Sequence, residues 1–199
     1  MARYRILPGR SRVWIEARST LHPIHTETSG LEGWLDFVVR DGGRVDLDAA
    51  PGAHLELKVD QLSSGNSLED RELRRRIDAR RYPTITGDLT VMRETDQDGR
   101  YRIEGDLTLK GVTRRYEDDM TLEAVDAETV VLAGQRTFDV RDFGVEPPRI
   151  LMLKVEPDVT VKVAIVAEKI PDPMKIPKTT KSEDGKPTGG KAAVEQEEG

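Results

Sequence analysis

Runs in which every second residue is apolar cover most of the chain up to about residue 165. This alternation is typical of β-strands that pack one face on a core and expose the other. The runs span residues 13–17, 35–39, 55–59, 85–91, 103–109, 120–124, 130–134, 151–155 and 159–165. The pattern therefore predicts an all-β domain of eight or nine strands.

Short groups of turn-forming residues separate several of the runs. They are Asp-Gly-Gly at 41–43, Asp-Gly at 98–99, Lys-Gly at 110–111 and Glu-Pro-Asp at 156–158. Gly accepts the positive φ of tight hairpins and Pro presets its own φ, so consecutive strands are predicted to be antiparallel neighbours. About eight such strands can close into a barrel, which removes the exposed edges of an open sheet. A two-sheet sandwich fits the same pattern.

One segment, residues 67–80, departs from the alternation and is rich in helix-forming residues. Ser67 and Asp70 resemble a capping box, which predicts that a short helix starts here. Its apolar stripe is thin, with Leu68, Leu73 and Ile77 as the main members. We therefore expect this helix at the mouth or side of the barrel and not in the core.

Composition separates a folded body from a tail. The chain has 199 residues, of which 36% are hydrophobic and 34% charged, and this length is enough for one domain with a sizeable core. Residues 171–199 hold four Pro, four Gly and no aromatic residue, a composition that cannot offset the entropy cost of ordering. The sequence predicts a barrel domain over residues 1–170 and a disordered polar tail over 171–199.

Charge and cysteine content narrow the function classes. The net charge of −6 argues against nucleic-acid binding, which requires a basic surface. The absence of Cys excludes disulfides, thiolate metal sites and Cys nucleophiles. No apolar run has the length of a signal peptide or reaches 18 residues, so a soluble, cytoplasmic protein without a transmembrane segment is expected.

Five short motifs occur in an order that resembles the YceI-like family over about residues 3 to 168. They are Tyr4-x-Ile6-x-Pro8-x-x-Ser11-x-Val13, Gly65-Asn66, Tyr82-Pro83-x-Ile85, Gly105-Asp106-Leu107-Thr108-x-x-Gly111-Val112-Thr113 and Arg141-Asp142-Phe143-Gly144. The resemblance implies a bacterial protein with a lipocalin-like antiparallel barrel, whose characterised relatives bind polyisoprenoid lipids. It also implies a homodimer.

The chain departs from the family pattern beside the Tyr-Pro motif. Arg74, Arg75, Arg76 and Ile77 stand where relatives tend to have aromatic residues, and Gly87 stands where they have Phe. We therefore expect a pocket wall that is less aromatic than usual and is built from Val, Ile, Leu and Met.

An eight-stranded barrel has room inside for side chains or for one slim ligand, such as a polyprenyl chain. Strand alternation points a set of apolar side chains inward as candidate ligand-binding residues. They are Val13, Ile15, Leu57, Leu107, Leu109, Leu122 and Leu132. The alternative is that the same side chains simply fill the barrel.

Arginines gather in the predicted helix, where Arg74, Arg75 and Arg76 are candidates for binding an anionic headgroup or for transient contact with an anionic membrane surface. The alternative is a solvated helix in which Glu72 pairs with Arg76 and Asp70 with Arg74.

His22 and His25 lie three residues apart around Pro23 and are weak candidates for a metal site completed by Glu27 or Glu32. The alternative is that both histidines are turn residues that hydrogen-bond to the backbone.

No nucleophile, P-loop or dinucleotide motif occurs, and we interpret the carboxylates Asp106, Asp118 and Asp119 as solvated. The predicted function is non-enzymatic binding, transport or storage of a long apolar lipid, a polyisoprenoid or an isoprenoid quinone, without a cofactor. Two alternatives remain at this point: a metal-assisted enzyme that uses His22 and His25, and a stress-linked interaction protein with a filled barrel.

Overall fold

The computed structural model describes residues 1–40, 42–150 and 153–171, and β-strands dominate this part of the chain. The strands are β1 (Ala2–Ile6), β2 (Arg12–Ser19), β3 (Pro23–Thr28), β4 (Glu32–Phe37), β5 (Gly52–Lys58), β6 (Thr84–Glu94), β7 (Arg100–Leu109), β8 (Val112–Ala124), β9 (Thr129–Asp139), β10 (Arg149–Ile150) and β11 (Leu153–Lys169). The helices are α1 (Ser67–Ile77) and the 3-10 turns η1 (Leu47–Ala49), η2 (Val59–Gln61) and η3 (Val140–Phe143).

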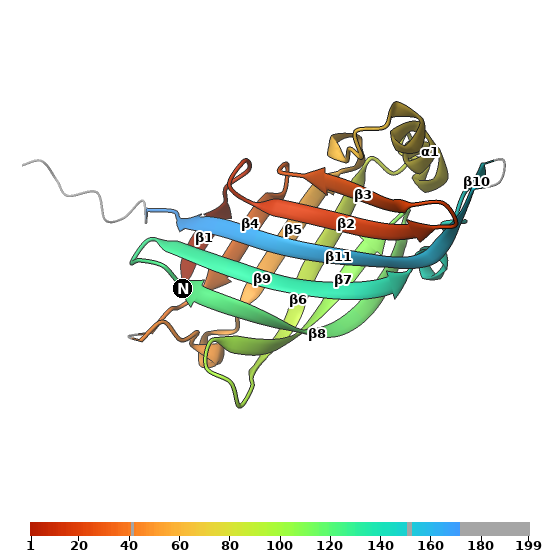
Figure 1. Ribbon diagram of the computed structural model, residues 1–199. Coiled ribbons are helices and arrows are strands. Elements are labelled where there is room, and N and C mark those ends of the chain that lie inside the picture. The colour runs from red at the N-terminus through yellow and green to blue at the C-terminus, as the bar shows by residue number, and fades with distance from the viewer. Residues whose placement is uncertain (41, 151–152, 172–199) are drawn as a thin grey trace, which may run out of the picture.

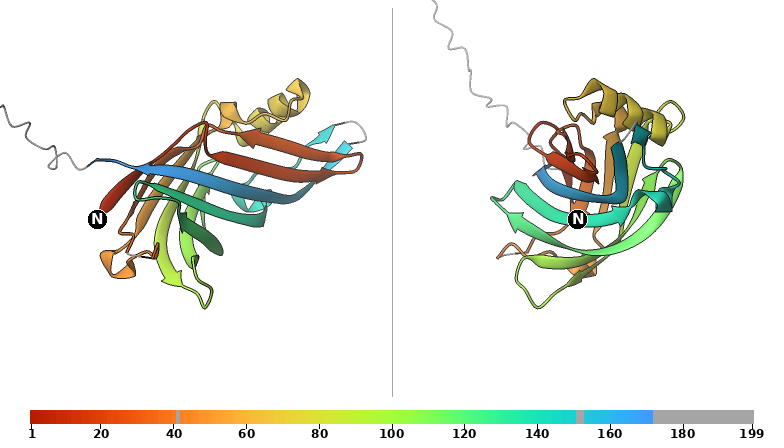
Figure 2. Two further views of the ribbon diagram at one scale, coloured as in Figure 1. Left: turned by 60° about the vertical axis from the view of Figure 1, so that its left-hand side comes forward. Right: turned by 45° about the vertical axis from the view of Figure 1, so that its right-hand side comes forward.

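Eight antiparallel strands close into a barrel in the order β1-β4-β5-β6-β7-β8-β9-β11, because β11 also pairs with β1. The predicted antiparallel barrel is thereby confirmed, and the sandwich alternative is wrong. β11 is 17 residues long. Its first part pairs with β2 and its end pairs with β1, so the β2–β3 hairpin extends the wall beyond β1 (Figures 1 and 2).

Two predicted runs, 151–155 and 159–165, prove to be parts of one strand as far as they are described, since residues 151–152 lie outside the described residues. The predicted hairpin at Glu156, Pro157 and Asp158 is therefore wrong. The pairing register with β2 shifts between Val155 and Val159 instead. Pro lacks an N–H for the ladder, and strands accommodate it at such irregularities.

The alternation also missed β1, β3 and the two-residue strand β10. β1 is only five residues long. β3 turns two polar side chains, Thr26 and Thr28, to the buried face, so it shows no apolar alternation. Hydrogen bonds with β2 on one side still hold it in the wall.

The β7–β8 hairpin forms at the predicted turn, where Lys110 and Gly111 have φ of 52° and 75°. A side chain at position 111 would also collide with Tyr82, whose Cε1 lies 2.6 Å from the place of a Cβ. The Tyr-Pro and Gly-Val-Thr motifs thus meet in space.

Helix α1 lies over one end of the barrel, as predicted (Figures 1 and 2). The helix starts at Ser67, as predicted, but its N-cap is Asn66, whose side chain accepts a hydrogen bond from the Leu68 N–H, so the predicted capping box of Ser67 and Asp70 is wrong. The helix ends at Ile77, before the predicted limit of 80. The helix lies at the barrel end, as predicted, but its last residue, Ile77, is buried in a core cluster that also contains Phe143.

Asp70 anchors the helix through the loop before it. The carboxylate accepts hydrogen bonds from the Ser64 N–H at 2.7 Å, the Ser64 hydroxyl at 2.8 Å and the Ser63 hydroxyl at 3.1 Å. Burial opposes its ionisation most strongly, but these bonds outweigh burial and hold the pKa of Asp70 below its usual value. The predicted pairing of Asp70 with Arg74 is replaced by these contacts.

The predicted tail falls on residues 171–199, of which all but Pro171 lie outside the described residues. Within the described part of the chain, no helix is long and apolar enough to cross a membrane.

Candidate functional site

The barrel interior contains two adjoining cavities. The first, below α1, has a volume of about 270 Å³, and we call it the helix-side cavity. The second lies between the inner faces of β4 to β9 and β11 and has a volume of about 230 Å³. We call it the slit-side cavity because it lies beside the slit where β8 and β9 separate. Leu107, Phe138 and Val161 belong to the walls of both. Because this space exists, side chains do not completely fill the barrel, and the filled-barrel alternative is wrong on that point.

All seven candidate ligand-binding residues lie on these walls. Val13, Ile15, Leu57, Leu107 and Leu109 line the helix-side cavity, and Leu107, Leu122 and Leu132 line the slit-side cavity. The structure thus brings the set together around one interior, as strand alternation predicts. That these residues bind a ligand stays a prediction.

Helix α1 closes the helix-side cavity with Leu73 and Ile77, and its charged residues Glu69, Glu72 and Arg76 complete the wall. The apolar stripe of the helix therefore faces the cavity. Leu68, predicted to belong to this stripe, is exposed.

Gly87 contributes to the space in the slit-side cavity. A Cβ at this position would meet only Leu55 atoms, at the ordinary contact distance of 3.8 Å. The interior therefore has room where the sequence lacks the Phe that the family resemblance implies. Met92 and Met120 line the same cavity.

Aromatic residues take a larger part in the wall than the sequence predicted. Phe37, Tyr101, Tyr116 and Phe138 line the slit-side cavity, and the rings of Tyr116 and Phe138 stack with centroids 6.0 Å apart. The expectation of a wall built only from Val, Ile, Leu and Met is therefore wrong.

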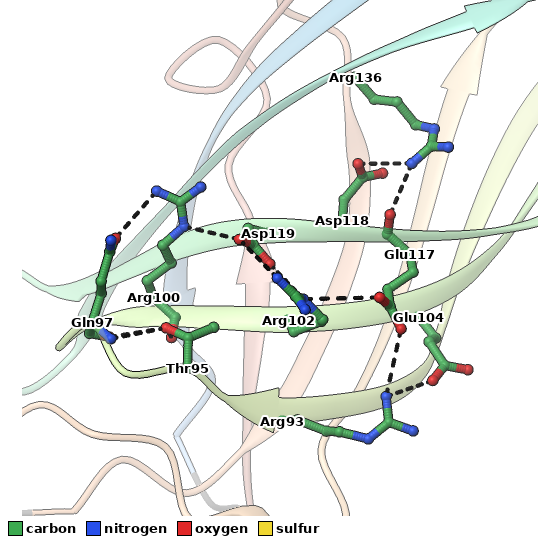
Figure 3. Close-up of polar contacts among 10 residues, drawn as sticks. All are labelled: Arg93, Thr95, Gln97, Arg100, Arg102, Glu104, Glu117, Asp118, Asp119 and Arg136. Carbon is green, nitrogen blue, oxygen red and sulfur yellow. Dashed lines mark hydrogen bonds and ion pairs between the residues drawn. The ribbon is translucent and has the colours of Figure 1, made fainter.

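The carboxylates of Asp118 and Asp119 lie on opposite sides of β8 (Figure 3). Asp119 pairs with Arg100 and Arg102 on the outer face, where guanidinium hydrogen bonds, chiefly from Arg102, lower its pKa. Asp118 lines the slit-side cavity and pairs with Arg136 of β9 at 2.8 Å. Asp106 pairs with Arg115 at 2.8 Å. The interpretation of Asp106, Asp118 and Asp119 as simply solvated carboxylates is therefore wrong, because each has an arginine partner.

Sequence reasoning missed Tyr116, Asp118, Arg136 and Phe138 as cavity residues. The signal was present, since Tyr116 and Asp118 continue the alternation of Met120 and Leu122 backwards along β8. Arg136 and Phe138 extend the alternation of Leu132 and Gly134 in the same way along β9. A strand that keeps its period while changing from apolar to charged residues marks a polar place inside the barrel.

The three arginines proposed for headgroup binding already have partners. Arg75 and Arg76 both donate to Glu72, at 2.7 Å, which confirms the predicted Glu72–Arg76 pair. Arg74 donates to the carbonyls of Asp60 and Leu62. Hydrogen bonding from Arg75 and then Arg76 outweighs burial and lowers the pKa of Glu72 to about 2.

The histidine pair does not converge on a shared site. His22 lies in the loop before β3, its Nδ1 is 3.0 Å from the Pro23 carbonyl, and its Nε2 is 4.0 Å from the Glu69 carboxylate. His25 is an exposed residue of β3 and no part of the predicted turn. Among the described residues, no group of three or more His, Cys, Asp or Glu side chains could hold a metal ion.

A larger hollow, of about 820 Å³, lies on the outer face beside β2 and β3, with Trp14, His25 and Glu27 in its wall. Its wall is a mixture of polar and apolar groups, and it is more open to solvent than the helix-side cavity. The interior is the better candidate site for an apolar ligand because its walls are mainly apolar.

Comparison with known proteins agrees with the fold. The BcnA protein of Burkholderia cenocepacia shares 17% identity and superposes with a TM-score of 0.66, covering 81% of this chain and 98% of its own. A polyisoprenoid-binding domain from Saccharophagus degradans, implicated in plant cell wall breakdown, shares 13% identity with a TM-score of 0.66, covering 84% of this chain and 98% of its own. The YceI protein of Campylobacter jejuni shares 14% identity with a TM-score of 0.63, covering 76% and 88%.

No curated protein sequence matches the chain. The model of the YceI-like domain matches residues 4–167, close to the extent that the five motifs predicted. Together with the closed barrel and its open apolar interior, this match shows that the chain belongs to the YceI-like domain family.

Proposed function

We propose that the protein binds one long apolar lipid, a polyisoprenoid or an isoprenoid quinone, inside the barrel and carries or stores it without chemical conversion. The observation that carries this proposal is the pair of adjoining apolar cavities within a closed wall. Either cavity alone is small for a ligand pocket, which typically has about 300–1,000 Å³, but a slim chain that runs through both would have enough room.

The chemistry of the walls supports a branched hydrocarbon chain. Leu, Ile and Val side chains supply most of the interior surface, and each buried CH₂-sized group of a ligand gains about 0.8 kcal/mol. Several isoprenoid units can therefore exceed the entropic cost of association. The Saccharophagus degradans domain of the same fold, described as polyisoprenoid-binding, points to the same class of ligand.

Contact of the helix with an anionic membrane, through Arg74, Arg75 and Arg76, stays a prediction. Because Glu72 and backbone carbonyls already bind these side chains, a headgroup would have to displace them or use the exposed part of Arg75. A homodimer and a cytoplasmic location likewise stay predictions.

Lipid extraction and mass spectrometry of the full chain purified from its native host test the proposal. A polyprenoid should co-purify with the wild-type protein, and Gly87→Phe should reduce its amount roughly tenfold because a ring would occupy the slit-side cavity. Thr86→Phe is the matched control, since Thr86 is the preceding residue of β6 and faces outward. Equal lipid in both variants, or no apolar lipid in the wild type, would contradict the proposal.

A further inference from the structure

Strands β8 and β9 separate along the wall of the barrel. They pair only from Met120 opposite Gly134 to Ala124 opposite Val130. β8 begins at Val112 and β9 continues to Asp139, and no ladder pair joins residues 112–119 to residues 135–139, all of which the structure describes. Figure 1 shows the two ribbons diverging from this point. We call this separation the β8–β9 slit.

Side chains close the slit in place of a backbone ladder. Arg136 reaches from β9 to β8, where its Nη1 donates to the Glu117 carbonyl and to the Asp118 carboxylate, each at 2.8 Å (Figure 3). Its guanidinium lies 4.3 Å from the centroid of the Tyr116 ring. The side chain of Arg136 therefore connects β9 to β8 across the slit.

The same place holds hydrogen-bonding capacity that the protein does not use. Among the described residues, the fully buried side-chain polar atoms without a hydrogen-bond partner are the Tyr116 hydroxyl and the Arg136 Nε. Arg136 Nη2 also makes no hydrogen bond within the described residues and, unlike Nε, is not fully buried. Buried polar groups in folded proteins are nearly always paired, so a cluster of unpaired donors beside an apolar cavity calls for a ligand group.

The charges around the slit favour an uncharged group. Asp118 neutralises Arg136 directly. Of the other charges close enough to act on Tyr116, Asp139 and Asp142 are negative and Arg114 is positive. Asp139 is in turn paired with Arg141. A phosphate here would thus meet no excess of positive charge, because three carboxylates face three guanidinium groups, whereas a hydroxyl or carbonyl oxygen needs only one free donor.

We propose that the β8–β9 slit receives the polar end of the bound lipid, and that this end is an uncharged oxygen group, a hydroxyl or carbonyl, which accepts a hydrogen bond from Arg136 Nη2. The inference rests on the proposed function, because the apolar chain of the same ligand would run inward past Leu107 and Val161 toward α1. Arg136 acts as a specificity-determining residue, and Asp118 sets its preference for an uncharged partner.

Three probes with the same 15-carbon chain test this inference on the full protein: farnesol, farnesyl monophosphate and the hydrocarbon farnesene. Competition against a fluorescent apolar probe gives their affinities. The wild type should bind farnesol about ten- to a hundredfold more tightly than farnesene, the effect of one net hydrogen bond to a charged donor. Arg136→Met should bring this ratio close to one, and Arg136→Lys should restore part of it.

The variant Asp118→Asn tests whether the Asp118 carboxylate makes Arg136 prefer an uncharged ligand group. It leaves Arg136 without its carboxylate, so the affinity for farnesyl monophosphate should rise about tenfold while that for farnesene stays unchanged. Asp119→Asn is the matched control, because Asp119 is the next residue of β8 on the outer face, and it should alter none of the ratios.

Retained farnesene binding shows that each variant is folded. An Arg136→Met protein that binds farnesene like the wild type and keeps its full preference for farnesol overturns the inference alone. A wild-type protein that binds farnesyl monophosphate more tightly than farnesol overturns the inference that the polar end of the ligand is uncharged. Failure of the wild type to bind farnesol and farnesene alike overturns the proposed function itself.

Discussion

The two cavities differ in how the protein treats the polar groups around them. At the helix-side cavity, Arg75 and Arg76 both bind Glu72, and Asp70 is held by the loop before the helix. At the slit-side cavity, the Tyr116 hydroxyl and the Arg136 Nε are left without partners. The charged residues that stand out in the sequence are thus occupied with holding α1, whereas the unoccupied donors belong to strands that appeared to be ordinary wall.

This difference separates structural from binding roles. A guanidinium that already has a carboxylate partner gains little from a ligand, because a new contact replaces an old one. A donor that has no partner within the protein loses no protein contact when a ligand binds, so its net hydrogen bond to the ligand adds to the affinity. We therefore expect changes at Glu72 to alter stability, and changes at Arg136 to alter ligand preference.

The largest effect on stability among these groups should follow from Glu72→Gln. The pKa of Glu72 is lowered to about 2 by Arg75 and then Arg76, so its ionised form stabilises the folded state at all pH values above the unfolded value of about 4.5. This contribution, about 1–2 kcal/mol after allowance for the exposed arginine partners, should disappear as the pH falls from about 4.5 toward 2. Urea unfolding of wild type and variant across this pH range measures it.

The matched control is Glu123→Gln, the same change at an exposed position of β8. It should leave the pH dependence as in the wild type. A Glu72→Gln protein whose free energy of unfolding stays parallel to that of the wild type from pH 7 to pH 2 would show that the Glu72 pairs do not stabilise the helix.

A change at Tyr116, beside the slit, should alter the free energy of unfolding by a smaller amount and in the opposite direction, towards greater stability. Tyr116→Phe removes a buried hydroxyl that has no partner, and burial is the main cause that raises the pKa of this hydroxyl. The empty protein should therefore gain up to about 1 kcal/mol in its free energy of unfolding. Thermal and urea unfolding of lipid-free protein measure the change. Destabilisation by a similar amount would mean that the hydroxyl has a partner in solution.

Alternation and turn chemistry predicted the strands and the inward faces of the seven candidates, because a period of two fixes the face of every residue in a strand. The family resemblance was needed to favour a barrel over a sandwich. They failed where the chain breaks the link between apolar residues and the interior. β3 turns Thr26 and Thr28 inward, and β8 turns Asp118 inward. The period of two still holds at these residues, but a pattern defined by apolar residues alone does not detect it. Pairing between strands is a separate matter, because it is not encoded in either strand alone.

The separation of β8 from β9 could not be predicted for the same reason. Both strands read as regular alternation, and their register becomes visible only when the ladder is seen to stop at Met120 and Gly134. The arginines of the helix were prominent in the sequence because they are consecutive. Helical spacing predicted that Glu72 pairs with Arg76, but the two backbone carbonyls that bind Arg74 could be identified only from the geometry.

The most direct test of lipid binding in the interior is photoaffinity labelling with geranylgeraniol that carries a diazirine at the end remote from the hydroxyl. With the hydroxyl at Arg136, the reactive end should form adducts with the helix-side wall, in the peptides that contain Leu57, Leu73 or Ile77. Excess unlabelled geranylgeraniol should suppress these adducts. Adducts confined to the outer hollow beside Trp14 and Glu27 would contradict binding inside the barrel.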